Sequence, residues 1–407
     1  MVKSVFVCSY GTLEHALGHL RFGAPLKKAG IRVTWHQPTE DLLPQHVETH
    51  DLVIVQRDFP RALEQYARLV EFASRYGKPI VFEFDDFLWG LPDDHPDRLS
   101  GHYLDALWPM LLAALQADAV TVSTPALQAF MRSLGHPHVY CLPNYLDDGL
   151  WPLAEPEDGE SASIVRIGYV GGDSHAPDVQ LVAPALERVL RQYRSDVQLT
   201  FWGVEPPAFL REYPNVIWNP AGFQNYAEFV EYLGHQNLDI FLAPLRDVPF
   251  NRFKSAIKYL ECTALGAAGI CSDVTPYRDV VEHGRTGFLA HTAEDWEQGL
   301  RTLIEDRQLR LDCARRAQEA VRQRWVLSEH YQEWDACYED ILKSYRSRSS
   351  AEVFRLADRI QMQYLAKYQG ELDALKQKNS ELHAQLASTH SSPLAWGLRR
   401  LRKLWRL

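Results

Sequence analysis

The feature that most constrains this chain is a repeated alternation of short apolar segments with longer helical ones. In the first part of the chain, the short segments rich in β-branched and aromatic residues are 2–8, 31–35, 52–55, 79–84, 119–122 and 139–142. Helical stretches such as 13–29 and 60–76 lie between them. Because apolar strands that alternate with helices form a parallel sheet covered on both faces, we expect an α/β domain over residues 1–150.

The same alternation begins again after an acidic, proline-bearing segment. Residues 151–163 are poor in large apolar side chains and predict a linker. Beyond it the expected strands are 166–170, 197–202, 216–218, 239–243, 269–272 and 287–289. We expect a second α/β domain over residues 164–325, facing the first across a cleft. Ligands bind such sheets at the carboxyl ends of their strands, so the cleft is the expected site of chemistry.

The C-terminal part has a different pattern. Residues 326–348 are helical and aromatic, and Trp325, Tyr331, Trp334 and Tyr338 form an apolar stripe that predicts packing back on the body. Residues 350–388 predict a coiled coil with a seam, spaced by threes and fours, of Leu365, Tyr368, Leu372, Leu375, Asn379, Leu382 and Leu386. This seam is consistent with a homodimer through residues 365–386 or with a single helix packed on its own domain.

The last segment, residues 393–407, is basic and amphipathic. It contains five cations and no acid, with leucine and tryptophan side chains grouped on one side of a helix. Such a segment suits an anionic membrane surface. A partner helix, RNA or plain solvent remain alternatives for this tail.

Composition limits the classes of partner and compartment. The formal net charge is −10, which argues against nucleic acid as a partner of the body. The six cysteines form no CxxC pairs, so we expect reduced thiols rather than disulfides or zinc ligands. No signal peptide opens the chain, and no apolar run approaches the roughly 20 residues that span a bilayer. We expect a cytoplasmic protein, with any membrane contact peripheral and at the inner face.

A glycine pair follows the first expected strand of the second domain. Gly171 and Gly172 precede His175 and the start of a helix. Glycine lets the backbone approach an anion, and a helix N-terminus offers amide groups to a phosphate. The pair is consistent with phosphate binding or with a simple tight turn.

A second loop of that domain gathers positive charge. Arg252, Lys254 and Lys258 flank Ser255 at the start of a helix, where positive charge opposes the helix dipole unless an anion is bound. This pattern predicts a phosphate or pyrophosphate ligand. Glu261 lies three residues after Lys258, so it could accept hydrogen bonds from sugar hydroxyls or pair with that lysine.

The first domain offers carboxylates at the end of its fourth strand. Glu83, Asp85 and Asp86 occupy the segment FEFDDFL. The two adjacent aspartates could hold a divalent cation, act as a base, position acceptor hydroxyls or cap a helix, and we favour acceptor positioning. Gly11 and Thr12 follow the first strand and are expected to line the cleft.

Residues 258–290 contain an ordered series of short motifs. These are Glu261, Ala264-Leu265-Gly266, Ser272-Asp273, Glu282-His283-Gly284 and Thr286-Gly287-Phe288-Leu289. The series resembles the donor-binding signature of GT-B glycosyltransferases of the retaining family-four group. Residues 166–178 resemble the opening strand and loop of the family's donor domain, and the segment around Pro143 and Asn144 resembles its interdomain crossing. The resemblance covers about residues 1–340.

The resemblance implies a glycosyltransferase that moves a sugar from a nucleotide-diphosphate donor to a glycan or lipid-linked acceptor, with retention, in surface polysaccharide or glycoconjugate assembly. Donor contacts are then expected from Gly171, Gly172, His175, Arg252, Lys254, Ser255, Lys258 and Glu261. Catalytic contributions are expected from Lys254, Lys258, Asp85 and Asp86, without a tightly bound cofactor or a required metal.

One position departs from the family pattern. Many members carry a first glutamate eight residues before the second, and this chain has Phe253 there. This departure and the long C-terminal helix leave a non-catalytic oligomeric scaffold as one alternative. A nucleotide-sugar epimerase, which has the same fold, is the other.

Overall fold

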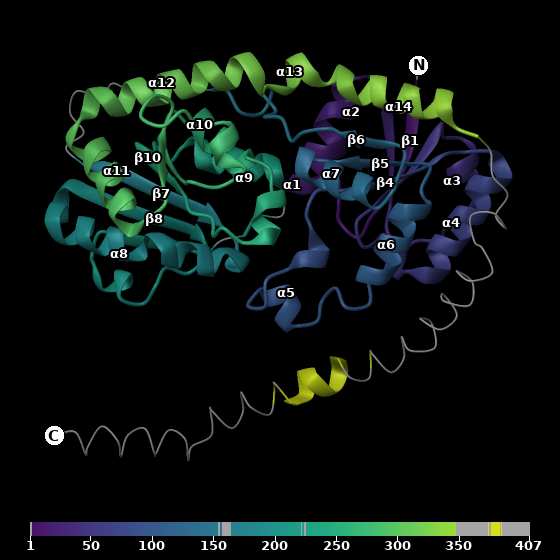
Figure 1. Cartoon of the computed structure of the whole chain (residues 1–407), viewed down its shortest axis with the longest axis horizontal. Helices are drawn as coiled ribbons and strands as arrows, with labels where there is room; N and C mark the ends of the chain where they lie inside the picture. The colour runs from purple at the N-terminus through teal and green to yellow at the C-terminus, as the bar shows by residue number, and fades with distance from the viewer. Residues whose placement is uncertain are drawn as a thin grey trace.

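The computed structural model describes residues 2–153, 155–156, 164–220, 222–223, 225–346, 373, 376–382 and 384. These residues form two α/β domains that lie side by side (Figure 1). Most of the predicted coiled coil and the whole predicted basic tail lie outside the described residues, so both stay predictions.

The first domain is built on a parallel sheet of six strands. Their order across the sheet is β2-β1-β3-β4-β5-β6. The strands are β1 (Ser4–Cys8), β2 (Arg32–His36), β3 (Leu52–Gln56), β4 (Ile80–Phe84), β5 (Ala119–Val122) and β6 (Val139–Cys141). All six were predicted; the four central strands are fully buried apolar runs, and the edge strands β2 and β6 are partly exposed. The strand order reverses between β1 and β3, and ligands of open α/β sheets bind at such a reversal.

The helices of this domain cover both faces of the sheet. They are α1 (Ala16–Gly18), α2 (Ala24–Lys28), α3 (Pro44–Glu48), α4 (Leu63–Tyr76), α5 (Pro96–Leu99), α6 (Leu107–Gln116) and α7 (Pro125–Ser133). The single helix expected over 13–29 is wrong in detail, since it begins at Ala16 and contains a π-helical turn at His19–Gly23. The chain enters the helix late because Gly18 packs on the preceding loop, where a Cβ atom would lie 2.1 Å from the Thr12 carbonyl oxygen.

The second domain repeats the plan with strand order β12-β11-β10-β7-β8-β9, again fully parallel. Its strands are β7 (Val165–Gly171), β8 (Val197–Gly203), β9 (Val216–Asn219), β10 (Ile240–Ala243), β11 (Ala268–Ser272) and β12 (Phe288–Ala290). Its helices are α8 (Ala176–Tyr193), α9 (Tyr226–Gly234), α10 (Ile257–Ala264), α11 (Ala293–Glu305) and α12 (Arg307–Arg324). This is the dinucleotide-binding strand order, whose reversal lies between β7 and β10.

Three helices connect the domains along one side of the molecule. Helix α12 leads into α13 (Leu327–His330) and α14 (Gln332–Ser344), and α14 lies over the first domain (Figure 1). Trp334 and Tyr338 are buried in the core cluster that contains strands β1 and β3. The aromatic stripe predicted around these residues therefore anchors the end of the chain's body to the first sheet.

The predicted α/β architecture of two facing domains is confirmed. All six cysteines are free thiols, five of them buried. Within the described ranges, no helix is both long and apolar enough to cross a bilayer.

Candidate active site

The loop after β7 leads directly into helix α8. Gly172 precedes a short 3-10 turn at Asp173–His175, and a Cβ atom built on Gly172 would meet open space. His175 donates or accepts through Nδ1 at 2.8 Å from Asp178 Oδ2, which lies in the first turn of α8. The positive charge of Lys258, together with burial, lowers the pKa of His175 to about 4. A neutral imidazole therefore stands beside the helix N-terminus at neutral pH.

Lys258 and Lys254 approach this loop from the start of helix α10. The Lys258 ammonium lies 4.8 Å from the centre of the Tyr169 ring, and burial lowers the pKa of Lys258. Lys254 Nζ lies 3.5 Å from Asp86 Oδ1 of the first domain. Both ammonium groups lower the pKa of His175, so the three side chains form one electropositive cluster. Such a cluster beside a helix N-terminus suits a diphosphate.

Glu261 lies one turn further along α10. The Tyr226 hydroxyl donates to Glu261 Oε1, and Trp151 Nε1 donates to the Tyr226 oxygen at 3.1 Å. Burial raises the pKa of Glu261 to about 7, against the opposing effects of Tyr226 and Lys258. One carboxylate oxygen is held by Tyr226, which leaves the other to accept hydrogen bonds from a ribose.

Ser255 belongs to a buried hydrogen-bond chain that crosses between the domains. Asn144 Nδ2 donates to Ser255 Oγ at 3.1 Å, and Arg21 Nη1 donates to Asn144 Oδ1 at 2.9 Å. Arg21 Nε in turn lies 2.6 Å from Glu83 Oε1. Glu83 is 1% exposed, so the prediction that it faces an acceptor in the cleft is wrong. Its carboxylate instead neutralises a buried arginine.

Asp85 and Asp86 directly follow β4, and Asp86 faces Lys254 of the second domain. Lys254, followed by Arg57, holds the pKa of Asp86 below its usual range despite burial. Burial and the neighbouring Asp86 raise the pKa of Asp85 to about 7. The nearest cation to Asp85 is Arg57, whose Nη1 lies 3.7 Å from Asp85 Oδ1. Asp86 is thus ionised at neutral pH, whereas Asp85 gains or loses its proton near neutral pH.

The predicted donor residue Arg252 and the neighbouring Phe253 make other contacts. Arg252 is exposed, and its Nε lies 2.7 Å from Asp247 Oδ1. Phe253, in the place of the family's first glutamate, stacks on Phe87 of the first domain with ring centres 4.3 Å apart. Thr124 Oγ1 also donates to the Phe253 carbonyl at 3.0 Å. This position is therefore used for contact between the domains.

Gly11 and Thr12 lie at the carboxyl end of β1, beside the strand reversal of the first sheet. The Gly11 carbonyl accepts hydrogen bonds from Trp35 and Gln37, each at 2.9 Å. The described part of the chain contains no group of three or more His, Cys, Asp or Glu side chains that could hold a metal ion.

Several residues at the site were not identified from the sequence. Arg57 directly follows β3, and the rule that ligands meet strand ends could have identified it. Tyr226, Trp151 and Arg21 had no comparable signal, because their contacts join segments between 35 and 123 residues apart.

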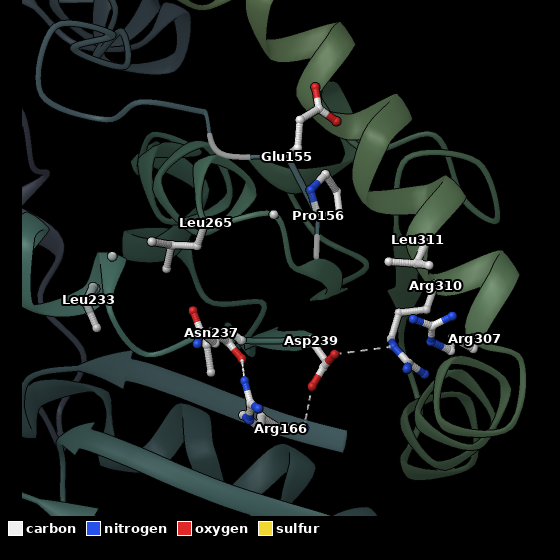
Figure 2. Close-up of a pocket in the computed structure, with 13 residues that line it drawn as sticks. Glu155, Pro156, Arg166, Leu233, Asn237, Asp239, Leu265, Arg307, Arg310 and Leu311 are labelled. Atoms are coloured by element: carbon white, nitrogen blue, oxygen red, sulfur yellow. Dashed lines mark hydrogen bonds and ion pairs between the residues drawn. The ribbon is translucent and has the colours of Figure 1, made fainter. Parts of the chain in front are cut away.

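A separate cavity of about 180 Å³ lies at the opposite edge of the second sheet. Figure 2 shows Arg166, Asp239 and Arg310 around it, joined by hydrogen bonds and an ion pair. Arg166 and Asp239 stand at the amino ends of β7 and β10. This cavity is therefore distinct from the cluster of Lys254, Lys258 and Glu261 at the carboxyl edge.

The second domain matches a known protein family. Residues 165–306 match the model of the family described as glycosyl transferases group 1. No curated protein matches the chain.

Solved structures share the fold over most of the chain at low identity. HepE from Anabaena in complex with UDP-glucose is 16% identical, with a TM-score of 0.57, and the match covers 84% of this chain and 100% of HepE. Sucrose-phosphate synthase from Thermosynechococcus elongatus is 13% identical, with a TM-score of 0.58 and coverage of 84% and 100%. A glycosyltransferase from Rickettsia africae is 12% identical, with a TM-score of 0.52 and coverage of 84% and 99%. The predicted GT-B fold is confirmed.

Proposed function

Because the chain contains a glycosyl transferases group 1 domain on a GT-B fold, we propose that it transfers a sugar from a nucleotide-diphosphate donor to a hydroxyl of a glycan or lipid-linked acceptor. The observation that carries this proposal is the cluster of His175, Lys254, Lys258 and Glu261 at the carboxyl edge of the second sheet, facing Asp86 across the cleft. HepE binds UDP-glucose, so a UDP-hexose is the first donor to test.

The roles follow from charge and position. Lys254 and Lys258 bind the diphosphate and stabilise the negative charge that grows on it as the bond to the sugar breaks. Glu261 accepts hydrogen bonds from the ribose. Asp85 and Asp86 position the acceptor hydroxyl, whose oxygen bonds to the anomeric carbon while its proton leaves with the departing diphosphate. No protein nucleophile is needed, in agreement with the retention that the family resemblance implies.

Nucleotide binding tests the donor site directly. Calorimetry with UDP, GDP, ADP and CMP should show one preferred nucleotide. That nucleotide should also raise the melting temperature, because a ligand that binds the folded state stabilises it by mass action. Glu261→Ala should weaken that binding at least tenfold, whereas Glu294→Ala, on the exposed start of α11, should not change it. If no nucleotide binds the wild type, the scaffold interpretation replaces the enzyme.

Turnover tests the chemistry. NMR of the product anomer should show retention, and chelation of divalent cations by EDTA should leave the rate unchanged. Conversion of the donor sugar to its epimer without an acceptor would instead identify an epimerase.

Assembly and location belong to the same proposal. We infer a cytoplasmic enzyme of surface polysaccharide or glycoconjugate assembly that dimerises through residues 365–386 and binds anionic membranes through residues 393–407. Removal of residues 347–407 should convert a dimer to a monomer in light scattering. Removal of residues 393–407 alone should abolish binding to vesicles that contain phosphatidylglycerol. An unchanged mass in the first experiment or unchanged vesicle binding in the second would contradict that part of the proposal.

A further inference from the structure

The first sheet has its own ligand position, at the strand reversal between β1 and β3. Arg57 is the first residue after β3, and Asp85 is the first residue after the neighbouring strand β4. Arg57 has a φ of 46°, a left-handed conformation that non-glycine residues rarely adopt. Its backbone N–H donates to the Glu83 carbonyl at 2.8 Å, which holds the arginine beside the end of β4.

The two side chains are close but do not satisfy each other. Arg57 Nη1 lies 3.7 Å from Asp85 Oδ1, which is too far for a hydrogen bond. Arg57 Nη2 donates to the Tyr103 hydroxyl at 3.1 Å. Within the described ranges, Arg57 Nε and Asp85 Oδ1 are buried polar atoms without a hydrogen-bond partner. The two side chains remain 19% and 16% exposed, so part of each is accessible to a ligand.

The other cations near Arg57 are already paired with carboxyl groups. They are Arg61 and Lys376, which both pair with Asp105, and Lys254 from the second domain. These cations and Arg57 face four carboxyl groups: Asp58, Asp85, Asp86 and Asp105. Arg61 already pairs with Asp105 at 2.8 Å, and Lys254 lies beside Asp86. An anionic ligand at Arg57 would therefore approach Asp85 and Asp86 with little compensation.

The chemistry of this pair selects a ligand that both donates and accepts. A hydroxyl group does both, so a sugar hydroxyl can accept from the Arg57 guanidinium and donate to the Asp85 carboxylate. A phosphate or carboxylate offers the ionised form of Asp85 no donor, so it would satisfy the arginine and repel that carboxylate. We propose that Arg57 and Asp85 form the acceptor-binding pair and select an uncharged, polyhydroxylated sugar over a phosphorylated or carboxylated one. This inference rests on the proposed function, because it places the acceptor opposite the donor cluster.

The test measures acceptor binding in the presence of saturating UDP. Saturation-transfer difference NMR would compare neutral probes, methyl α-glucopyranoside and methyl N-acetylglucosaminide, with the anionic probes glucose 6-phosphate and glucuronic acid. We expect at least tenfold tighter binding of a neutral probe. Arg57→Lys and Asp85→Asn should each weaken it about tenfold, since lysine lacks the planar guanidinium fork and a neutral amide oxygen is a weaker acceptor than a carboxylate. The surface arginine Arg75, paired with Glu71, provides the control Arg75→Lys, with no expected change.

The outcomes separate this inference from the proposed function. Calorimetry should give a UDP affinity within twofold of wild type for both variants, and thermal unfolding should confirm that each is folded. Preference for an anionic probe, binding of no neutral probe, or unchanged binding in both folded variants would overturn the selection of a neutral acceptor while UDP still binds. Loss of UDP binding in the wild type would instead refute the proposed donor site.

Discussion

The Glu261 carboxyl shows how local environment sets the properties of a single residue. Burial raises its pKa to about 7, while the Tyr226 hydrogen bond and the Lys258 charge act in the opposite direction. The acid form is therefore favoured in the folded protein relative to the unfolded chain. Its stabilising contribution is present below the unfolded pKa, near 4.5, and is lost as pH rises through about 7. A ribose that donates hydrogen bonds to Glu261 prefers the ionised form.

Nucleotide affinity should therefore depend on pH through this group. Between pH 5.5 and 7, binding of the preferred nucleotide should strengthen as pH rises, by up to about tenfold per pH unit, because binding releases one proton from Glu261. Calorimetry in buffers of different ionisation enthalpy measures that proton. Glu261→Gln should remove the dependence, and Asp85→Asn, which removes the other group with a pKa of about 7, should retain it. The assignment fails if the Glu261→Gln profile keeps the wild-type slope.

Lys258 should act on the phosphates rather than on the nucleoside. We expect Lys258→Ala to weaken UDP binding about tenfold and to leave uridine binding unchanged, because the ammonium charge at the start of α10 has no other anionic ligand in the donor. Loss of transition-state stabilisation should reduce kcat/KM by about 10²–10³-fold. Competition calorimetry and initial rates measure the two effects, with Lys343→Ala, at an exposed side chain of α14, as the matched control. Equal losses for UDP and uridine would contradict the phosphate role.

At the scale of elements, the short 3-10 helix Pro249–Phe253 of the second domain packs against the first domain. Phe253 stacks on Phe87, and Phe250 belongs to the first domain's core cluster. Arg246, just before this helix, makes two hydrogen bonds with Asp94, at 2.7 and 2.9 Å. Lys254 directly follows this helix, so these contacts hold Lys254 beside Asp86 of the first domain.

Phe253→Ala should loosen this contact. Truncation of a partly buried aromatic side chain should reduce the free energy of unfolding by about 1–3 kcal/mol and widen the interdomain cleft. Chemical denaturation and small-angle scattering measure these changes. Phe253→Leu should retain most of the contact, and Phe209→Ala, at a side chain 38% exposed, should have little effect. An unchanged radius of gyration together with unchanged stability would show that the stack does not hold the domains.

At the scale of the whole molecule, Arg21 joins four separate parts of the chain. Its guanidinium contacts Glu83, Asn144 and the Leu142 carbonyl, and its own carbonyl accepts from Trp334 Nε1 at 3.0 Å. Asn144 continues to Ser255 of the second domain. One buried cation therefore holds together strand β4, the interdomain crossing near Asn144, the loop that carries Ser255 and helix α14.

Loss of this cation should destabilise the whole protein. We expect Arg21→Ala to lower the free energy of unfolding by about 3–5 kcal/mol, because it leaves the Glu83 carboxylate buried without a partner. The double variant Arg21→Met with Glu83→Leu should recover part of this loss by removing both charges. Arg75→Ala, on the exposed surface, should change stability by less than about 0.5 kcal/mol. Urea denaturation monitored by tryptophan fluorescence measures these effects, and additive losses in the double variant would contradict a paired role.

The strand pattern predicts twelve strands in two parallel sheets. A motif within about 30 consecutive residues predicts the GT-B fold and identifies Lys254, Lys258 and Glu261 as candidate donor ligands. The amino-acid sequence could not predict that Glu83 is a buried counter-ion, that Phe253 joins the domains or that Arg57 faces Asp85. Those roles depend on which distant segments meet, and side chains of the same type serve as ligand, counter-ion or core according to the charge and burial around them.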